Sequence, residues 1–157
     1  MRLLITMILF LCWSVTAHAC RLTRALTTDE MAMAQTVFLG TVIKYHKPQK
    51  SERRLSLYTP STITFEVQEV LSGRMVAKQI TLNWYPNWNV AHPDSLDAFI
   101  RAYGTLTRIG IVYPETFPED SNIPSILSPK ESAHPVIIRG ACSTPFLYPA
   151  NEKSTIR

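Results

Sequence analysis

Residues 62–69 read Thr-Ile-Thr-Phe-Glu-Val-Gln-Glu, and this short stretch decides the fold class. Its apolar members Ile63, Phe65 and Val67 alternate with polar neighbours. Successive side chains of a β-strand point to opposite faces of a sheet, so strict alternation is typical of a strand with one face in the core and the other in water. The stretch therefore predicts a half-buried β-strand.

The same alternation returns in residues 79–84, which read Gln-Ile-Thr-Leu-Asn-Trp. A turn is predicted between the two strands at residues 71–74, which read Leu-Ser-Gly-Arg, and the two strands are expected to form a hairpin. Trp84 falls on the same side of its strand as Ile80 and Leu82, so we expect its indole in the core.

Other segments combine β-branched and aromatic residues and are predicted to be strands: residues 37–45, 108–113 and 136–138. Gly40 lies inside the first of them. A glycine at such a position indicates a bulge or a sharp bend, as in a small coiled barrel.

Short helices are expected beside these strands. Residues 27–30, which read Thr-Thr-Asp-Glu, offer capping hydroxyls and acidic side chains for the start of a short helix ahead of residues 31–34, which read Met-Ala-Met-Ala. A second helix is expected over residues 94–101. Five strands with one or two short helices predict a mainly β protein with a five-stranded barrel of OB type, because closure removes exposed sheet edges.

The first 19 residues have the features of a secretory signal peptide. Arg2 supplies a positive start, and residues 3–12 are almost wholly apolar. Ala17 and Ala19 form the A-x-A pattern that a signal peptidase reads. The apolar run is too short to anchor the chain across a bilayer, which takes about 20 residues. We therefore expect a signal peptide at residues 1–19 and no membrane span.

Cleavage after Ala19 would leave Cys20 as the first residue of a periplasmic or secreted protein. The mature chain is then expected to consist of a barrel domain at residues 20–149 and a flexible polar tail at residues 150–157.

The cysteine count depends on this cleavage. Cys12 leaves with the leader, so Cys20 and Cys142 remain. Two cysteines in an exported chain predict one disulfide, because oxidising compartments favour it. The alternative is a buried free thiol at Cys142 and a lipid on Cys20, which would anchor the protein to a membrane. The Ala-His-Ala sequence before Cys20 fits ordinary cleavage better than lipidation, so the disulfide is preferred.

The formal net charge of +4 is modest, and the densest basic group lies in residues 44–54 among proline and polar residues. A basic run can attract nucleic acid or an anionic membrane. Here we interpret it as a solvated loop, and export removes most nucleic-acid partners. A protein partner or a glycan is expected instead.

Tyr85 and Trp88 are the candidate ligand-binding residues, because they follow the third strand in a loop marked by Pro86 and Asn87. Exposed aromatic rings can stack on a sugar, a base or a peptide, and OB barrels bind oligomers through their loops. The alternative is that both rings cap the end of the barrel.

The sequence contains no recognisable catalytic or metal-binding motif. His46, His92 and His134 are isolated, without the spacing that metal ligands need, and are expected to be solvated. A G-x-S-x-G nucleophile motif is absent too. The sequence therefore predicts a protein that is not an enzyme and uses no cofactor. A hydrolase with scattered site residues is the enzymatic alternative.

Short pieces of the chain carry a family resemblance: Cys20 as the mature N-terminus, Ala34, Val-Phe-Leu-Gly-Thr-Val at residues 37–42, and Thr-Phe-Glu-Val-Gln-Glu-Val-Leu-Ser-Gly at residues 64–73. The chain resembles the netrin-module and tissue-inhibitor-of-metalloproteinase group over residues 20–73, whereas residues 84–135 show no such likeness. The resemblance implies an OB-fold barrel whose N-terminal cysteine is tied to the barrel by a disulfide, with Cys142 as its partner.

In inhibitors of this group, the amine and carbonyl of the first cysteine chelate the catalytic zinc of a protease, whose open coordination position such groups can fill. The resemblance implies this role for Cys20, with Arg21 beside it entering the specificity pocket. The chain departs from the group at Leu22, where a second cysteine is usual, and at Arg21, where a small hydroxyl residue is usual. A shared fold does not fix function. The favoured prediction is therefore an exported, non-enzymatic interaction module, with metalloprotease inhibition as the alternative.

Overall fold

The computed structural model of this protein describes residues 24–47, 60–74, 76–85, 92–114, 134–139 and 143–151. Its helices and strands follow one another as α2 (Thr28–Ala32), β1 (Thr36–His46), β2 (Ser61–Gly73), β3 (Gln79–Trp84), α3 (Leu96–Tyr103), β4 (Leu106–Val112), β5 (Val136–Ile137) and β6 (Leu147–Pro149).

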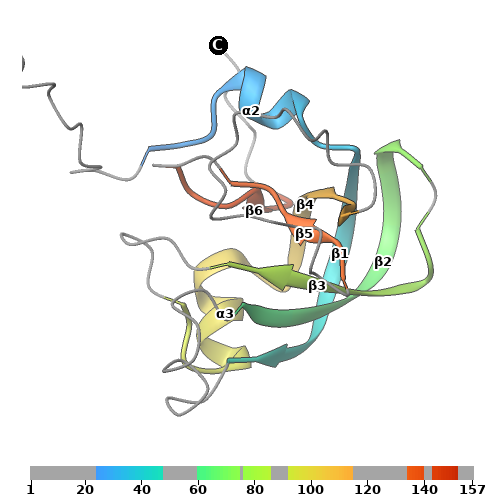
Figure 1. Cartoon of the computed structure of the whole chain (residues 1–157). Helices are drawn as coiled ribbons and strands as arrows, with labels where there is room; N and C mark the ends of the chain where they lie inside the picture. Colours follow the sequence, from blue (N-terminus) through green and yellow to red (C-terminus); the bar gives the residue numbers. More distant parts are fainter. Residues whose placement is uncertain are drawn as a thin grey trace, which may run out of the picture.

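The strands β1 to β5 form a closed five-stranded barrel in the order β1-β2-β3-β5-β4, and pairing of β4 with β1 completes the ring (Figure 1). Neighbouring strands are antiparallel except β3 and β5, which run parallel where Asn83 pairs with Val136. β6 is an extra strand that pairs with the first half of β4. With α3 between β3 and β4, this topology is of OB type, so the predicted fold class is confirmed.

The hairpin of β1 and β2 bends to close the barrel because its register is irregular. One register shift falls between Leu39 and Gly40, where the extra residue is Gln68 of β2, so the bulge lies in the strand opposite Gly40. A Cβ atom at residue 40 would lie 2.9 Å from Phe38 Cε2 and 3.1 Å from Phe65 Cβ. Glycine therefore also lets these two core rings meet edge to face, with centroids 6.2 Å apart.

β2 is longer than the sequence predicted. The turn expected at residues 71–74 is wrong, since Ser72 and Gly73 still pair with Val37 and Thr36 of β1. The side chains at this end of β2 are exposed, so the alternation that marks the strand fades before the backbone pairing ends. The strand ends at Gly73, whose φ of +88° is a conformation that other residues rarely adopt.

The barrel interior is filled by a cluster of buried side chains: Phe38, Val42, Ile63, Phe65, Leu82, Trp84, Phe99, Ile109, Ile111, Tyr113, Ile137 and Leu147. Trp84 is 1% exposed, as its place in the alternation predicts. Burying an apolar side chain of this kind stabilises the fold by about 1.5–3 kcal/mol relative to leaving it in water.

α3 lies at one end of the barrel and α2 at the other (Figure 1). The hydroxyl of Ser95 accepts a hydrogen bond from the first turn of α3 and so begins the helix. Phe99 points into the barrel, where its ring centroid lies 5.7 Å from that of Tyr45. The helix expected over residues 94–101 is thus confirmed, and both of its ends lie two residues further along the chain.

A second apolar cluster, the outer cluster, consists of buried side chains outside the barrel: Leu26, Val112, Val136, Ile138 and Phe146. Ile109 and Ile111 belong to the interior cluster, so Gly110 and Val112 between and after them face outward. Gly110 makes room for Phe146, because a Cβ atom there would lie 2.1 Å from Phe146 Cδ1. The outer cluster therefore depends on a glycine in β4.

The sequence predicted one of the two C-terminal strands and missed the other. The strand expected at residues 136–138 is confirmed as β5. β6 was not predicted, although it follows Phe146 and holds the end of the domain on β4. Beyond it, the Ala150 amide donates to the Leu106 carbonyl at 3.0 Å.

Replacing Gly110 by alanine is expected to lower the free energy of unfolding by about 1–3 kcal/mol, the usual cost of overpacking, because the new methyl group displaces Phe146. Chemical denaturation followed by tryptophan fluorescence measures the loss. The double variant Gly110→Ala with Phe146→Leu should lose less than the sum of its single variants, because the smaller side chain gives back space. Additive losses would show that the two residues do not compete for the same volume.

Candidate functional site

The residues singled out from the sequence lie mostly beyond the described chain. Cys20, Arg21, Trp88 and Cys142 are outside the residues that the structure describes. Tyr85 follows β3 and is half-buried, packed against the outer cluster. A candidate site must therefore be built from other side chains.

The histidines do not share the solvated environment expected for them. His46 is exposed, as predicted, and His134 is half-buried. For His92 the prediction is wrong: its ring stacks on Trp84 with centroids 4.2 Å apart, and its Nδ1 lies 2.5 Å from the Ser61 hydroxyl oxygen. The isolated position of His92 in the sequence gave no sign of this contact, because its partners come from two different strands.

A polar cluster around the Ser61 hydroxyl fastens the segment before α3 to the barrel. Besides His92, the Tyr45 hydroxyl lies 3.3 Å from Ser61 Oγ and donates to the Pro93 carbonyl at 2.9 Å. A serine hydroxyl beside an imidazole is the pair from which a nucleophile and its base are built. Ser61 is fully buried, however, so a substrate does not reach its hydroxyl in this structure. The cluster holds the end of the barrel together.

The start of the described chain lies against its C-terminal segment. Arg24 forms a parallel bridge with Ser143, and the Thr144 amide donates to the Arg24 carbonyl at 2.8 Å. Leu26 is buried in the outer cluster. Residues 24–26 are thus held on the barrel, beside the segment that begins at Ser143.

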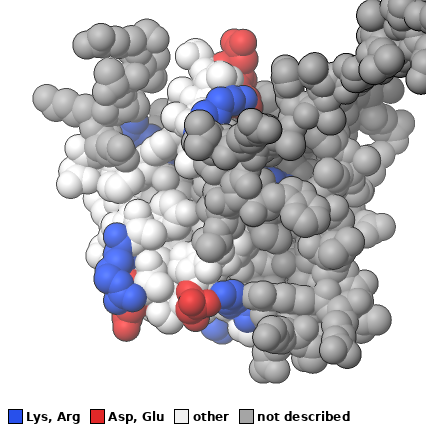
Figure 2. Space-filling model, turned by 90° about the vertical axis from the view of Figure 1, so that its left-hand side faces the viewer, with Lys and Arg blue, Asp and Glu red and all other residues white. Residues whose placement is uncertain are grey.

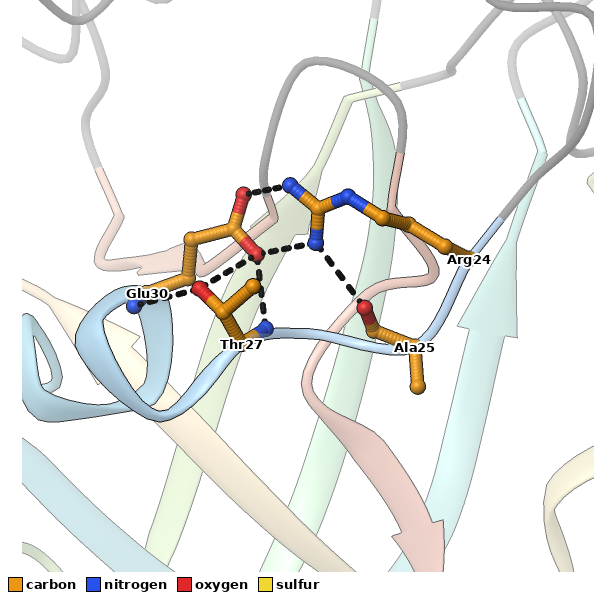
Figure 3. Close-up of polar contacts among 4 residues, drawn as sticks. All are labelled: Arg24, Ala25, Thr27 and Glu30. Atoms are coloured by element: carbon orange, nitrogen blue, oxygen red, sulfur yellow. Dashed lines mark hydrogen bonds and ion pairs between the residues drawn. The ribbon is translucent and has the colours of Figure 1, made fainter.

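Arg24 and Glu30 fix this start in place (Figure 3). Arg24 donates from Nη1 to Glu30 Oε2 at 2.6 Å and from Nη2 to Oε1 at 2.7 Å. The same carboxylate accepts from the Thr27 amide at 2.8 Å, while the Thr27 hydroxyl accepts from the Glu30 amide at 3.2 Å. The expected short helix is confirmed, and of the two threonines that the sequence offered, this capping box identifies Thr27 as the cap of α2. The hydrogen bond from Arg24, together with those from Thr27, lowers the pKa of Glu30 against the opposing effect of burial.

Two hollows in the surface share the side chain of Tyr148, and together we call them the Tyr148 groove. The larger one, the Arg24 hollow, has a volume of about 690 Å³ and lies between the N-terminal segment, α3 and the β6 region. Its lining consists of Arg24, Ala25, Ala102, Tyr103, Thr144, Leu147, Tyr148, Pro149 and Asn151. Polar and apolar groups are mixed in it.

The smaller one, the Arg108 hollow, has a volume of about 360 Å³. Its lining consists of Thr28, Met31, Ala32, Val37, Leu71, Ser72, Arg108, Phe146 and Tyr148. Apolar side chains dominate this lining, and Arg108 is its charged member. Both volumes fall in the range of about 300–1,000 Å³ that is usual for ligand sites.

Each hollow contains a buried polar atom without a hydrogen-bond partner in the described chain. These atoms are Thr144 Oγ1 in the Arg24 hollow and Arg108 Nε in the Arg108 hollow. Buried polar groups are nearly always hydrogen-bonded, and leaving one without a partner costs about 1–3 kcal/mol. Both atoms lie beneath the surface of the hollows, so a bound molecule supplies the missing contact only if neighbouring side chains move.

Two ion pairs lie on the described barrel. Lys47 forms an ion pair with Asp94, as Arg24 does with Glu30. Figure 2 shows a face on which basic and acidic side chains lie close to one another, with uncharged surface between these groups. The described part of that face therefore carries no broad area of a single charge.

Tyr103 is one of the residues that line the Arg24 hollow. Burial, together with repulsion from Tyr45, raises the pKa of Tyr103 to about 12, so its hydroxyl keeps its proton at neutral pH. The groove thus offers hydrogen-bonding groups in one half, and an apolar surface with one cation in the other.

The described ranges contain neither a cluster of metal ligands nor a helix that could span a membrane. Among these residues, no three or more histidine, cysteine, aspartate or glutamate side chains gather so that they could hold a metal ion. None of the helices in this part of the chain has the length and apolar character needed to cross a membrane.

Comparison with known proteins gives no assignment: no protein-family model, no curated protein and no solved structure matches this chain. The function is therefore argued from the groove itself.

Sequence reasoning missed the groove, because its lining comes from segments that only the fold brings together. The sequence did contain two signals. Arg108 interrupts an otherwise apolar strand on its outward side. Residues 145–148 read Pro-Phe-Leu-Tyr, an apolar run that follows the last expected strand and could have indicated a further one.

Replacing Glu30 by glutamine is expected to lower the free energy of unfolding by about 1 kcal/mol, the size of a lost helix cap. Because the folded-state pKa of Glu30 is lowered, its contribution is present above the unfolded-state pKa and is lost as the pH falls through the folded-state value. Urea unfolding between about pH 7 and pH 3 should therefore show the difference between wild type and variant shrinking as the pH falls.

The matched control for this prediction is Glu69→Gln, at an exposed position of β2, which should change the stability little at any pH. A difference for Glu30→Gln that grows towards low pH would contradict the role assigned to its carboxylate.

Proposed function

We propose that this protein is an exported, non-enzymatic interaction module of OB type that binds a protein partner through the Tyr148 groove. One observation carries the proposal: each half of the groove holds a buried polar atom, Thr144 Oγ1 or Arg108 Nε, without a hydrogen-bond partner in the described chain. A partner whose binding moves the side chains that cover these atoms would satisfy both and recover about 1–3 kcal/mol for each.

The packing of the barrel favours a site on its surface over one inside it. Phe38, Phe65 and Trp84 fill the interior and are at most 1% exposed. Protein interiors packed in this way leave no space for a ligand between their side chains. Binding by OB barrels uses the outer strand faces and the loops, which agrees with a groove on the outside.

Tyr148 is suited to the centre of an interface. It is half-buried, and its ring packs against Phe146 with centroids 5.6 Å apart. A tyrosine offers a large apolar area with a polar tip, and tyrosines are enriched among the residues that dominate binding energies. Because the ring is already held by its neighbour, little conformational entropy is lost when a partner covers it.

A protein partner fits the groove better than a glycan. Met31, Val37 and Leu71 give the Arg108 hollow an apolar wall. Such a wall favours apolar side chains, whereas burying sugar hydroxyls against it without hydrogen bonds would cost free energy. The larger hollow, with its polar groups, can accept the backbone of the same partner.

The proposal includes export and a disulfide between Cys20 and Cys142. Cys20 lies four residues before Arg24. Even a fully extended chain would therefore place it no more than about 14 Å from Arg24. Cys142 directly precedes Ser143, the bridge partner of Arg24. This bridge supports the pairing, because it leaves both cysteines within reach of each other. A disulfide that closes a loop on the order of 100 residues stabilises a fold by about 4–5 kcal/mol.

Metalloprotease inhibition through Cys20 is the second candidate function. It is favoured by the contacts of Arg24 with Ser143 and Glu30, which hold the start of the described chain on the barrel. An inhibitor that inserts its N-terminus benefits from such rigidity, since less conformational entropy is lost on binding. The amine and carbonyl of Cys20 would fill the open position of the protease zinc, with Arg21 entering the neighbouring pocket.

A photo-crosslinking residue, p-benzoylphenylalanine, in place of Tyr148 is expected to capture a protein partner in cells that export the chain. The same residue at Ile43, exposed on β1 and outside the lining of both hollows, is the matched control and should capture none. Gel mobility and mass spectrometry identify the product. Equal capture from both positions, or no capture from residue 148, would contradict the proposal.

Mass spectrometry of the exported protein is expected to find Cys20 as the N-terminal residue and no free thiol after unfolding. Two reactive thiols, or an acylated Cys20, would overturn the disulfide. An extra alanine before Cys20 tests the second candidate, because it moves the free amine away from the cysteine. It should abolish any inhibition of a zinc protease and leave the crosslink at residue 148 unchanged.

A further inference from the structure

We infer that the Arg108 hollow binds the carboxyl terminus of a peptide chain whose last side chain is large and apolar. The inference rests on the proposed function, since it names the chemistry of the partner in one half of the Tyr148 groove. Three features support it: the outward position of Arg108, its guanidinium without a hydrogen bond or ion pair to another described residue, and the apolar lining around it.

Arg108 projects from the outer face of the barrel. Its neighbours in β4, Thr107 and Ile109, are fully buried, so residue 108 faces the opposite way. Across the sheet, Arg108 is in register with Leu39 of β1 and with Tyr148 of β6. The guanidinium therefore belongs to a strip of three strands that forms one wall of the hollow.

The guanidinium of Arg108 forms no hydrogen bond or ion pair with another described residue, and its Nε is buried without an acceptor. The ion pairs of the described chain use other cations, Arg24 with Glu30 and Lys47 with Asp94. A buried part of a charged group is costly unless it is paired. An anion that enters the hollow would meet the other N–H groups of the guanidinium, since Nε is shielded from solvent, and would pair a charge that has no counter-ion among the described residues.

A carboxylate attached to an apolar group matches this hollow. A guanidinium can bind a carboxylate through two parallel N–H donors, and such charge-assisted hydrogen bonds are roughly twice as strong as neutral ones. The surrounding lining of Met31, Ala32, Val37, Leu71 and Phe146 takes up hydrocarbon. Surroundings of low polarity also strengthen the attraction between the two charges.

A chain terminus supplies both features in one residue. The hollow, at about 360 Å³, is near the lower limit for ligand sites and suits one residue better than an acidic and an apolar residue from the middle of a chain. The carboxylate and side chain of a last residue leave the same Cα atom, so they can meet Arg108 and the apolar lining together. The preceding residues would pass Tyr148, which lines both hollows, and extend towards the Arg24 hollow.

Small probes test the inference on the exported, oxidised protein. N-acetyl-L-phenylalanine carries the terminal carboxylate and an apolar side chain, and N-acetyl-L-phenylalaninamide is the matched probe without the charge. Titration followed by amide NMR shifts should show at least tenfold tighter binding of the acid, which corresponds to about 1.4 kcal/mol. Arg108→Met keeps an apolar stem and removes the charge, so it should reduce the affinity for the acid to that for the amide.

Two further variants keep the experiment decisive. Arg108→Lys retains the charge and should keep part of the preference for the acid, although it lacks the paired donors of arginine. Arg101→Met removes an exposed cation from α3, outside both hollows, and should leave the preference unchanged. Thermal melting establishes that each variant is folded.

Equal affinities for acid and amide overturn the inference, as does a preference for the acid that survives in Arg108→Met. Decanoate and decanol separate a peptide terminus from a free fatty acid. Decanoate that binds tenfold more tightly than N-acetyl-L-phenylalanine overturns the peptide occupant. If no probe binds while the crosslink at residue 148 forms, the inference fails and the proposed function stands. If the acid binds selectively and no crosslink forms, the carboxylate site stands and the proposed function fails.

Discussion

The pairing of β1 with both β2 and β4 is the interaction on which the rest of the structure depends. Residues 36–41 are paired on both edges, with residues 66–73 of β2 and with residues 106–111 of β4. This double pairing closes the barrel around its core and requires the bulges that bend the hairpin. It also determines which side chains of β4 face outward. The outward-facing side chains of β4 in turn form part of the outer face of the barrel, where both ends of the domain lie.

The groove lies where the two ends of the domain converge. Arg24 at the start of the described chain is bonded to the backbone around Ser143, and Tyr148 is in register with Arg108. Because these segments are joined to each other and to the barrel by backbone hydrogen bonds, the walls of the groove are set before a partner arrives. Thr144 and Arg108 belong to the linings of the two hollows already in the free protein. Such preorganisation lowers the entropy lost on binding.

The fold was predictable where local periodicity governs it, and the groove was not. Residues 62–69 and 79–84 alternate strictly, lie in β2 and β3, and bury Trp84 where the alternation placed it. The contacts of His92 could not be predicted in this way. Its ring stacks on Trp84, and such a contact produces no spacing pattern in the sequence. The lining of the groove is assembled from both ends and several strands of the domain, which no local pattern encodes. Arg108 was visible as a charge in a mostly apolar strand, and residues 145–148 as an apolar run, but the surroundings of Arg108 depend on β6 and α2.

The parallel contact between β3 and β5 gives the ring an uneven strength. It consists of one register pair, Asn83 with Val136, beside a hydrogen bond of 2.9 Å from the Asn83 amide to the Pro135 carbonyl. Local opening costs least where few hydrogen bonds must break. The barrel therefore has a seam at which thermal breathing begins, while β1, which is paired along both edges, stays closed.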